Sequence, residues 1–209
     1  GTFNASDILN WNVPVIARSV PNAQFIDKQW MVADSSNGNL YLAYTRYANN
    51  FQFNEIQFQR LTPGGAWSTP ITLSAPADTG LVQGARVGVG PNGEVYAIWA
   101  AISLTTDEDF FRFRVSSDQG LNWSTQVSLP GYIANWGTGA PGFSREFGIT
   151  YPSLAVDRTQ GSERGRVWVA WNESYNHIND PAPGSPPVLV EVENDKLASR
   201  AIAFAAGKM

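Results

Sequence analysis

Cysteine is absent from this chain of 209 residues, and histidine occurs only once, as His177. Disulfides and thiol chemistry are therefore excluded, and so is a zinc site built from several histidine and cysteine ligands. Charged residues make up only 15% of the chain, the net charge is −4, and no stripe of Lys and Arg occurs, so we expect no nucleic-acid partner. Because no apolar run approaches the roughly 18 residues of a membrane-spanning helix, we expect no membrane span either.

Aromatic side chains, glycine and proline are plentiful instead. Aromatic residues reach 12%, with 8 tryptophans, and the chain has 19 glycines and 13 prolines. Many short strands joined by turns give this profile. An apolar share of 43% together with a low net charge indicates a folded core rather than disorder, and the length fits a single all-β domain.

A repeated segment is the clearest feature of the sequence: a glycine followed by a dense run of apolar and aromatic residues. Its copies are residues 38–44, 93–99 and 165–171. Each copy follows another short apolar segment, and turn residues lie between the two. The preceding segments are residues 30–34, 85–89 and 152–157. The pattern predicts three β-hairpins whose second strands are buried on both faces.

A second repeat runs in step with the first. Residues 67–73 read Trp-Ser-Thr-Pro-Ile-Thr-Leu, and residues 123–129 read Trp-Ser-Thr-Gln-Val-Ser-Leu. Together the two repeats define a unit of about four strands over about 55 residues, the size of a propeller blade with one enlarged loop. Near the end of the sequence, residues 197–207 are rich in alanine, and we favour a strand over residues 200–204 to a helix there.

A turn motif of the form Ser-x-Asp-x-Gly-x-x-Trp ends at the second of these tryptophans. Its residues are Ser116, Asp118, Gly120 and Trp123. Ser and Asp side chains can hydrogen-bond turn amides, glycine permits the positive φ of a tight turn, and tryptophan packs across the hairpin. Residues 60–67 carry a decayed version, in which Arg60 and Thr62 stand in the places of the Ser and Asp.

This motif, in phase with a three-fold repeat, resembles the Asp-box of the sialidase-like (BNR repeat) β-propeller family. Residues 27–34 and 162–171 are also similar to segments of secreted bacterial members. The resemblance implies an all-β fold, a β-propeller of four-stranded antiparallel blades, with about three of the family's six blades in this chain. The expected blades of this single segment are residues 27–74, 84–130 and 150–205. The resemblance also implies that the Asp-box is structural and lies away from the ligand face.

A ring sector of three blades leaves two sheet faces uncovered. Three explanations are open: the chain is a fragment of a longer protein, two copies combine into one ring as a homodimer, or the chain packs inside a larger assembly. Residues 13–18 are a candidate outer closing strand, which two chains would exchange in the second case.

Candidate ligand-binding residues lie on the loops that the resemblance places on the ligand face. They combine aromatic rings, arginines and several acceptors, a set suited to a glycan. The candidates are Arg46, Tyr47, Asp107, Trp136, Arg145, Glu146, Glu173, Tyr175 and His177. We expect no cofactor and no metal, because the acidic run at residues 107–109 alone does not supply the 6–8 oxygens that Ca²⁺ requires.

Sialidases similar to this family hold the sugar carboxylate with three arginines, and they use a Tyr–Glu pair as nucleophile and an Asp as acid and base. The nearest match to their first arginine motif, residues 18–21 (Arg-Ser-Val-Pro), has one extra residue, and we assign no catalytic residue. The favoured interpretation is a non-catalytic, secreted or cell-surface module that binds a glycan or protein partner. The alternatives are a partial exo-sialidase-type glycoside hydrolase and a structural subunit of a surface assembly.

Overall fold

The computed structural model describes residues 13–48, 52–106, 108–132 and 151–171, together with the backbone of three short strands. These strands are β1 (Thr2–Phe3), which pairs with β2 (Leu9–Asn10), and β13 (Ile202–Phe204). Apart from one 3-10 turn, η1 (Pro76–Asp78), the regular structure of this part of the chain is β-strand, which confirms the all-β prediction. No helix within it is long and apolar enough to cross a membrane.

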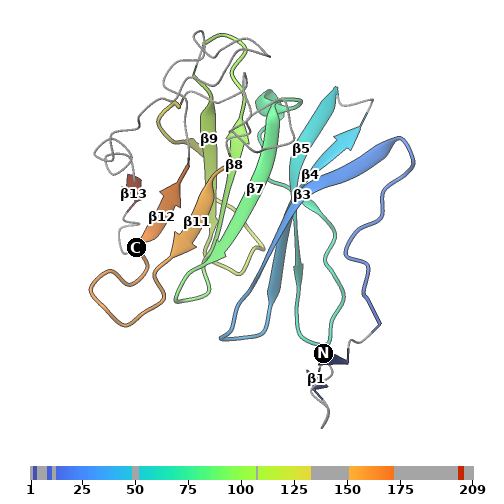
Figure 1. Ribbon diagram of the computed structural model, residues 1–209, viewed down its shortest axis with the longest axis vertical. Coiled ribbons are helices and arrows are strands. Elements are labelled where there is room, and N and C mark those ends of the chain that lie inside the picture. Colours follow the sequence, from blue (N-terminus) through green and yellow to red (C-terminus); the bar gives the residue numbers. More distant parts are fainter. Residues whose placement is uncertain are drawn as a thin grey trace, which may run out of the picture.

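Three antiparallel sheets follow one another along the chain (Figure 1). The first consists of β3 (Gln24–Ala33), β4 (Leu40–Ala48), β5 (Phe53–Leu61) and β6 (Ile71–Thr72), in that order. The second consists of β7 (Val82–Val89), β8 (Val95–Ala101), β9 (Phe110–Ser116) and β10 (Val127–Ser128). The third consists of β11 (Ser153–Val156), β12 (Val167–Ala170) and β13. Two sheets therefore have the predicted four strands, and the described part of the third has three.

Each sheet begins with the hairpin that the sequence predicts. The last register pairs before the three turns are Ala33 with Leu40, Val89 with Val95, and Val156 with Val167. The glycine of the repeat lies inside each turn at a positive φ, the conformation that glycine adopts without steric cost. These φ values are 78° at Gly38, 87° at Gly93 and 85° at Gly165. A strand also lies where one was predicted over residues 200–204: β13 spans residues 202–204 and pairs with β12.

Two apolar clusters lie between the sheets. We call the face of a sheet on the side of the next sheet its leading face, and the opposite face its trailing face. The same names apply to the outer faces of the first and third sheets, at the positions that the repeat makes equivalent. The first cluster joins Tyr41, Ala43, Ile56 and Phe58 of the first sheet to Val87, Val95, Ala97 and Trp99 of the second. The second cluster joins Tyr96, Ile98 and Phe111 of the second sheet to Val167 and Val169 of the third. Tyr41 and Tyr96, which the repeat makes equivalent, thus both lie on leading faces.

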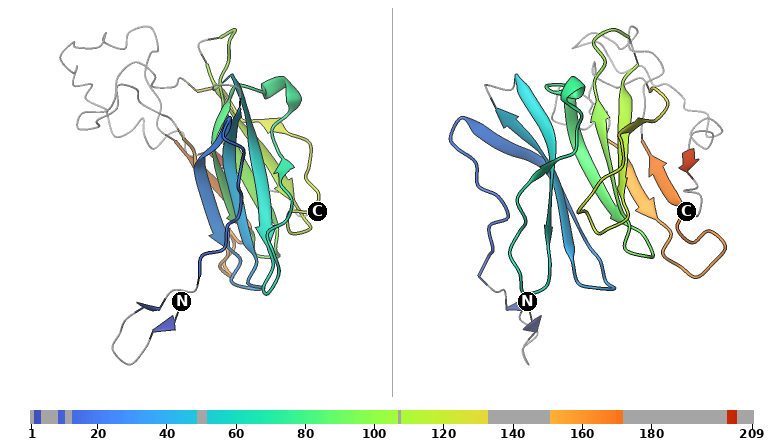
Figure 2. Two further views of the ribbon diagram at one scale, coloured as in Figure 1. Left: turned by 90° about the vertical axis from the view of Figure 1, so that its right-hand side faces the viewer. Right: turned by 180° about the vertical axis from the view of Figure 1, so that it is seen from behind.

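The first strands of the three sheets lie side by side. Strand β7 contacts β3 on one side and β11 on the other (Figure 1). Figure 2 shows from two further sides that the hairpin turns following these strands are all at the same end of the molecule. The three sheets stack in series and do not close into a ring within the described part of the chain.

A bulge recurs at the same place in β3 and in β7. The register shifts lie between Asp27 and Trp30 in β3 and between Gln83 and Arg86 in β7. A residue with positive φ sits in each bulge, Lys28 at 53° and Gly84 at 71°. Because such bulges turn the following side chain to a new direction, Trp30 and Arg86 are presented in the same way by two successive sheets.

Residues 13–18 require a correction. They were a candidate for an outer closing strand, but within this chain they belong to no strand of the structure. The carbonyl of Ala17 accepts a hydrogen bond from the Gln59 side-chain amide at 3.0 Å. The segment is therefore held by a side chain of β5 and not by a backbone ladder.

The alignment of the decayed turn motif also requires a correction. Leu61 pairs with Leu40, as Ser116 pairs with Val95, so Leu61 and not Arg60 takes the place of the motif serine. The first turn is one residue shorter than the second, so counting back from the tryptophan places the serine position one residue too early. The sheet register gives the correct equivalence. Gly64 keeps the positive φ of the motif glycine, at 72°.

Candidate functional site

The three first strands place one column of side chains at equivalent positions. Its members are Trp30, Arg86 and Ser153. Their cross-strand partners are Ala43, Ile98 and Ala170, respectively. Arg86 and Ser153 lie between apolar or small residues, whereas Trp30 follows the polar residues 27–29.

Arg86 is the centre of this column. Its guanidinium carbon lies 4.4 Å from the centroid of the Trp30 ring and 6.0 Å from that of Tyr151. Its Nη1 donates to the Ala85 carbonyl at 3.1 Å. Partial burial lowers the pKa of Arg86, but a guanidinium stays charged at neutral pH. Among the residues that the structure describes, no carboxylate forms an ion pair with it.

The β7 bulge lets Tyr151 approach this arginine. A Cβ atom on Gly84 would lie 2.1 Å from Cδ1 of the Tyr151 ring, so only glycine allows the ring to pack against the strand here. The Trp30 side chain is 45% exposed. An exposed indole beside a guanidinium that no carboxylate of the described residues pairs with can stack on a sugar ring and bind a carboxylate at the same time.

Two of the residues predicted from the sequence lie in the described part of the chain, and both are engaged within the first sheet. The Arg46 guanidinium pairs with Glu55 at 2.8 Å and donates to Gln24 at 3.0 Å. Tyr47 is buried and stacks on Phe25, with ring centroids 4.5 Å apart. Burial raises the pKa of Tyr47 to about 12. The structure does not bring these two side chains to the Arg86 column. The other candidates lie outside the described residues: Asp107, Trp136, Arg145, Glu146, Glu173, Tyr175 and His177.

The Asp-box turn has the hydrogen bonds that its sequence predicts. Ser116 Oγ donates to Asp118 at 2.7 Å and accepts from the Gly120 amide at 2.8 Å. Asp118 accepts from the backbone and side-chain nitrogens of Asn122 at 2.8 Å and 2.7 Å. The Trp123 ring packs edge-on against a phenylalanine of the first sheet. The turn thus anchors the second sheet to the first.

We expect Asp118→Asn to lower the melting temperature at neutral pH. Hydrogen bonds from Asn122, followed by the bond from Ser116, lower the pKa of Asp118 to about 2. The unfolded chain has a higher pKa, about 3.9, so the ionised carboxylate stabilises the fold above that pH and the stabilisation is lost as pH falls toward 2. Thermal unfolding of both chains from pH 7 downward should show a difference that shrinks below about pH 4. A difference that is constant with pH would contradict this role.

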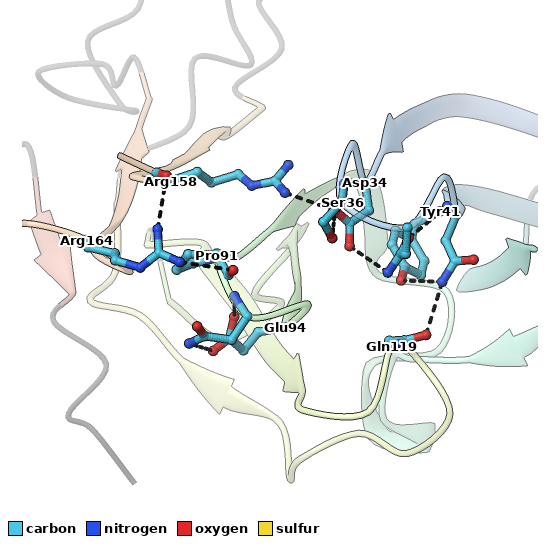
Figure 3. Close-up of polar contacts among 11 residues, drawn as sticks. Asp34, Ser36, Tyr41, Pro91, Glu94, Gln119, Arg158 and Arg164 are labelled. Atoms are coloured by element: carbon cyan, nitrogen blue, oxygen red, sulfur yellow. Dashed lines mark hydrogen bonds and ion pairs between the residues drawn. The ribbon is translucent and has the colours of Figure 1, made fainter. Parts of the chain in front are cut away.

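A polar network joins the three sheets at their turn end (Figure 3). Asp34, which is fully buried, accepts hydrogen bonds from the amide and hydroxyl of Ser36 at 2.9 Å and 2.7 Å. It also accepts one from Arg158 at 2.9 Å, which ties the third sheet to the first. Arg164 donates to the Pro91 carbonyl at 3.2 Å, which ties the third sheet to the second. Burial would raise the pKa of Asp34, but these hydrogen bonds outweigh it and lower the pKa. The network holds the sheets together and offers no free group to a ligand.

The Arg86 column lies outside the recognised motifs, but the repeat carries a signal for it. Aligning the first strands of the repeat places Trp30 at the position of Arg86, and Arg86 is unusual between the apolar or small residues Ala85 and Val87. No sequence pattern indicates that Tyr151 lies beside Arg86, because this contact depends on how the third sheet packs against the second.

Comparison with known proteins adds no constraint on the function. No protein-family model matches the chain. No curated protein matches it at a significant level. The resemblance to sialidase-like propellers therefore stays a prediction from the sequence.

Proposed function

We propose that this chain is a segment of a sialidase-like β-propeller, secreted or at the cell surface, that binds an acidic glycan without cleaving it. The ligand site is the Arg86 column, with Trp30 as the stacking surface. The observation that carries the proposal is a guanidinium held against two aromatic rings with no carboxylate partner in the described part of the protein.

The arrangement of the sheets supports the propeller part of this proposal. Each sheet presents equivalent residues to the next one, and the first strands lie side by side. The turns after these strands share one end of the molecule (Figure 2). Sheets that fan around a common axis have these relations, and the Arg86 column lies on the first strands, which are side by side.

The chemistry of the column supports an acidic sugar. A guanidinium donates two parallel hydrogen bonds to a carboxylate, and such charge-assisted bonds are about twice as strong as neutral ones. An indole face packs against the apolar face of a sugar ring. A neutral glycan would use only the indole and would leave the charge of Arg86 unmatched.

The carboxylates near the inner strands support binding without cleavage. Glycoside hydrolysis needs two carboxyl groups placed on either side of the scissile bond. Asp27 is paired with its neighbour Lys28 at 3.1 Å, and Asp34 is enclosed in the turn network. In the described part of the chain, these two carboxylates are thus each engaged within the protein.

Titration calorimetry with three simple ligands tests the proposal: the methyl glycosides of sialic acid, glucuronic acid and galactose. We expect the two acidic sugars to bind more tightly than galactose. Arg86→Gln should weaken the acidic sugars by about tenfold or more and leave galactose unchanged, since one charged hydrogen-bond pair is lost. Trp30→Ala should weaken all three.

Arg60→Gln is the matched control, because this arginine lies on the third strand of the first sheet and outside the column. Its binding should equal that of the original chain. Circular dichroism should show that each variant is folded. Equal affinity for acidic and neutral sugars, or no effect of Arg86→Gln on a folded chain, would refute the site.

A further inference from the structure

In the described part of the chain, the leading face of the third sheet is partly exposed. Trp168 is 40% exposed, whereas Tyr96, at the equivalent position of the second sheet, is 4% exposed. Ala155 is also exposed, whereas its equivalent Gly88 is buried against the third sheet. In β12, Val167 and Val169 are buried in the core, whereas Trp168 and Ala170 face outward.

The first sheet leaves part of its trailing face open. Met31 is 56% exposed, and Ala33 is exposed as well. Their equivalents in the second sheet, Val87 and Val89, are 2% and 3% exposed, because the leading face of the first sheet covers them. The chain therefore exposes both halves of an interface that it forms twice internally.

We propose that a second copy of this chain binds head to tail, with the trailing face of its first sheet on the leading face of the third. The inference rests on the propeller arrangement proposed above, but not on the glycan site. An unrelated partner would have to match one face, whereas a second copy carries the equivalents of both halves of the internal interface. Two such contacts, related by a two-fold axis, cover the open leading and trailing faces of both copies.

The internal interface supplies the contact expected between the copies. A Cβ atom on Gly88 would lie 3.1 Å from Cδ2 of Leu154 and 3.3 Å from Cγ2 of Val156. The repeat places Ala155 at the position of Gly88, Met31 at that of Leu154 and Ala33 at that of Val156. Ala155 of one copy is therefore expected to contact Met31 and Ala33 of the other.

The segment before the first sheet adds apolar surface to the same trailing face. Val15 is 72% and Ile16 is 78% exposed, next to the Ala17 carbonyl that contacts Gln59 of β5. Since this contact lies toward the outer strands, the inner part around Met31 stays open to a second copy. Apolar side chains gathered beside an open sheet face mark an interaction surface.

Cysteine cross-linking tests the contact directly, because the chain has no cysteine of its own. Ala155→Cys and Ala33→Cys chains are mixed and oxidised, and we expect a disulfide-linked dimer. A disulfide needs Cβ atoms about 3.5–4.5 Å apart, so it reports contact and not mere proximity. Leu104→Cys mixed with Ala155→Cys is the matched control, since Leu104 is 78% exposed in a loop, and it should give no dimer above background.

Sedimentation velocity supplies a second measurement on the chain without substitutions. We expect twice the monomer mass at tens of micromolar, and Trp168→Glu should weaken the association by about tenfold or more. A monomer at all concentrations, with no cross-link beyond the control, would overturn the proposal.

A doubly substituted chain distinguishes a failure of the second-copy proposal from a failure of the propeller arrangement. Gly88→Cys combined with Val156→Cys within one chain should form an internal disulfide if the second and third sheets stack as the structure has them. An internal disulfide without a cross-linked dimer rejects the second copy and keeps the arrangement. If neither the internal disulfide nor the cross-linked dimer forms, the stacking of the second and third sheets is rejected as well.

Discussion

Trp99→Ala is expected to lower the free energy of unfolding by about 3–5 kcal/mol, the usual cost of removing a large aromatic side chain from a core. Trp99 is completely buried on the trailing face of the second sheet, within the cluster that joins this sheet to the first. Its indole nitrogen has no hydrogen-bond partner in the structure, so the loss is one of packing. Because the cavity is bounded by two sheets, neither can collapse into it without separating from its other neighbours.

Guanidinium chloride unfolding of both chains measures this change, with the slope of the transition used to check that each unfolds in one step. Leu104→Ala is the control, because this leucine is 78% exposed and its removal should cost less than about 0.5 kcal/mol. A loss below about 1 kcal/mol for Trp99→Ala would mean that the first two sheets do not share this core.

Gly120→Ala is expected to destabilise the chain by about 2–5 kcal/mol, which combines two separate effects. Gly120 has a φ of 83°, a conformation that costs any other residue about 1–2 kcal/mol. In addition, its Cβ would lie 2.6 Å from the ring of Phe58 in the first sheet. The ring is fully buried and packs against Trp123, so it cannot move aside without disturbing the core.

Gly64→Ala separates the two effects. Gly64 is the equivalent glycine of the first turn, with a φ of 72°, but a Cβ there would meet no atom within 4 Å. It should therefore cost only about 1–2 kcal/mol. The same denaturation experiment compares the two variants, and equal losses would show that the second turn does not pack on Phe58.

Local patterns were enough to predict the hairpins and the Asp-box turn. A glycine with positive φ, a dense apolar run and a serine that bonds its own turn are each decided by neighbouring residues. Longer strands were underestimated: β3 begins at Gln24, several residues before the predicted start at residue 30. The bulge at Lys28 explains this, because it interrupts the alternation that marks a strand.

Contacts between distant parts of the chain could not be predicted. The ion pair of Asp34 with Arg158 joins two turns that belong to different sheets. Arg112 binds Asp78 through two hydrogen bonds, at 3.0 Å and 3.1 Å, across the connection between the first and second sheets. In each case the residue types allow a pair, but many other pairs would satisfy the same charges.

The sequence by itself determined the repeat, the hairpin turns and the all-β class, because these depend on residues within one unit and on the period of its apolar side chains. Only the tertiary structure decided which faces of the sheets are covered and that Trp30, Arg86 and Tyr151 lie together. The physical reason is that stacking of sheets is driven by nondirectional apolar burial. A strand pattern shows that a face will be buried, but not which sheet will cover it.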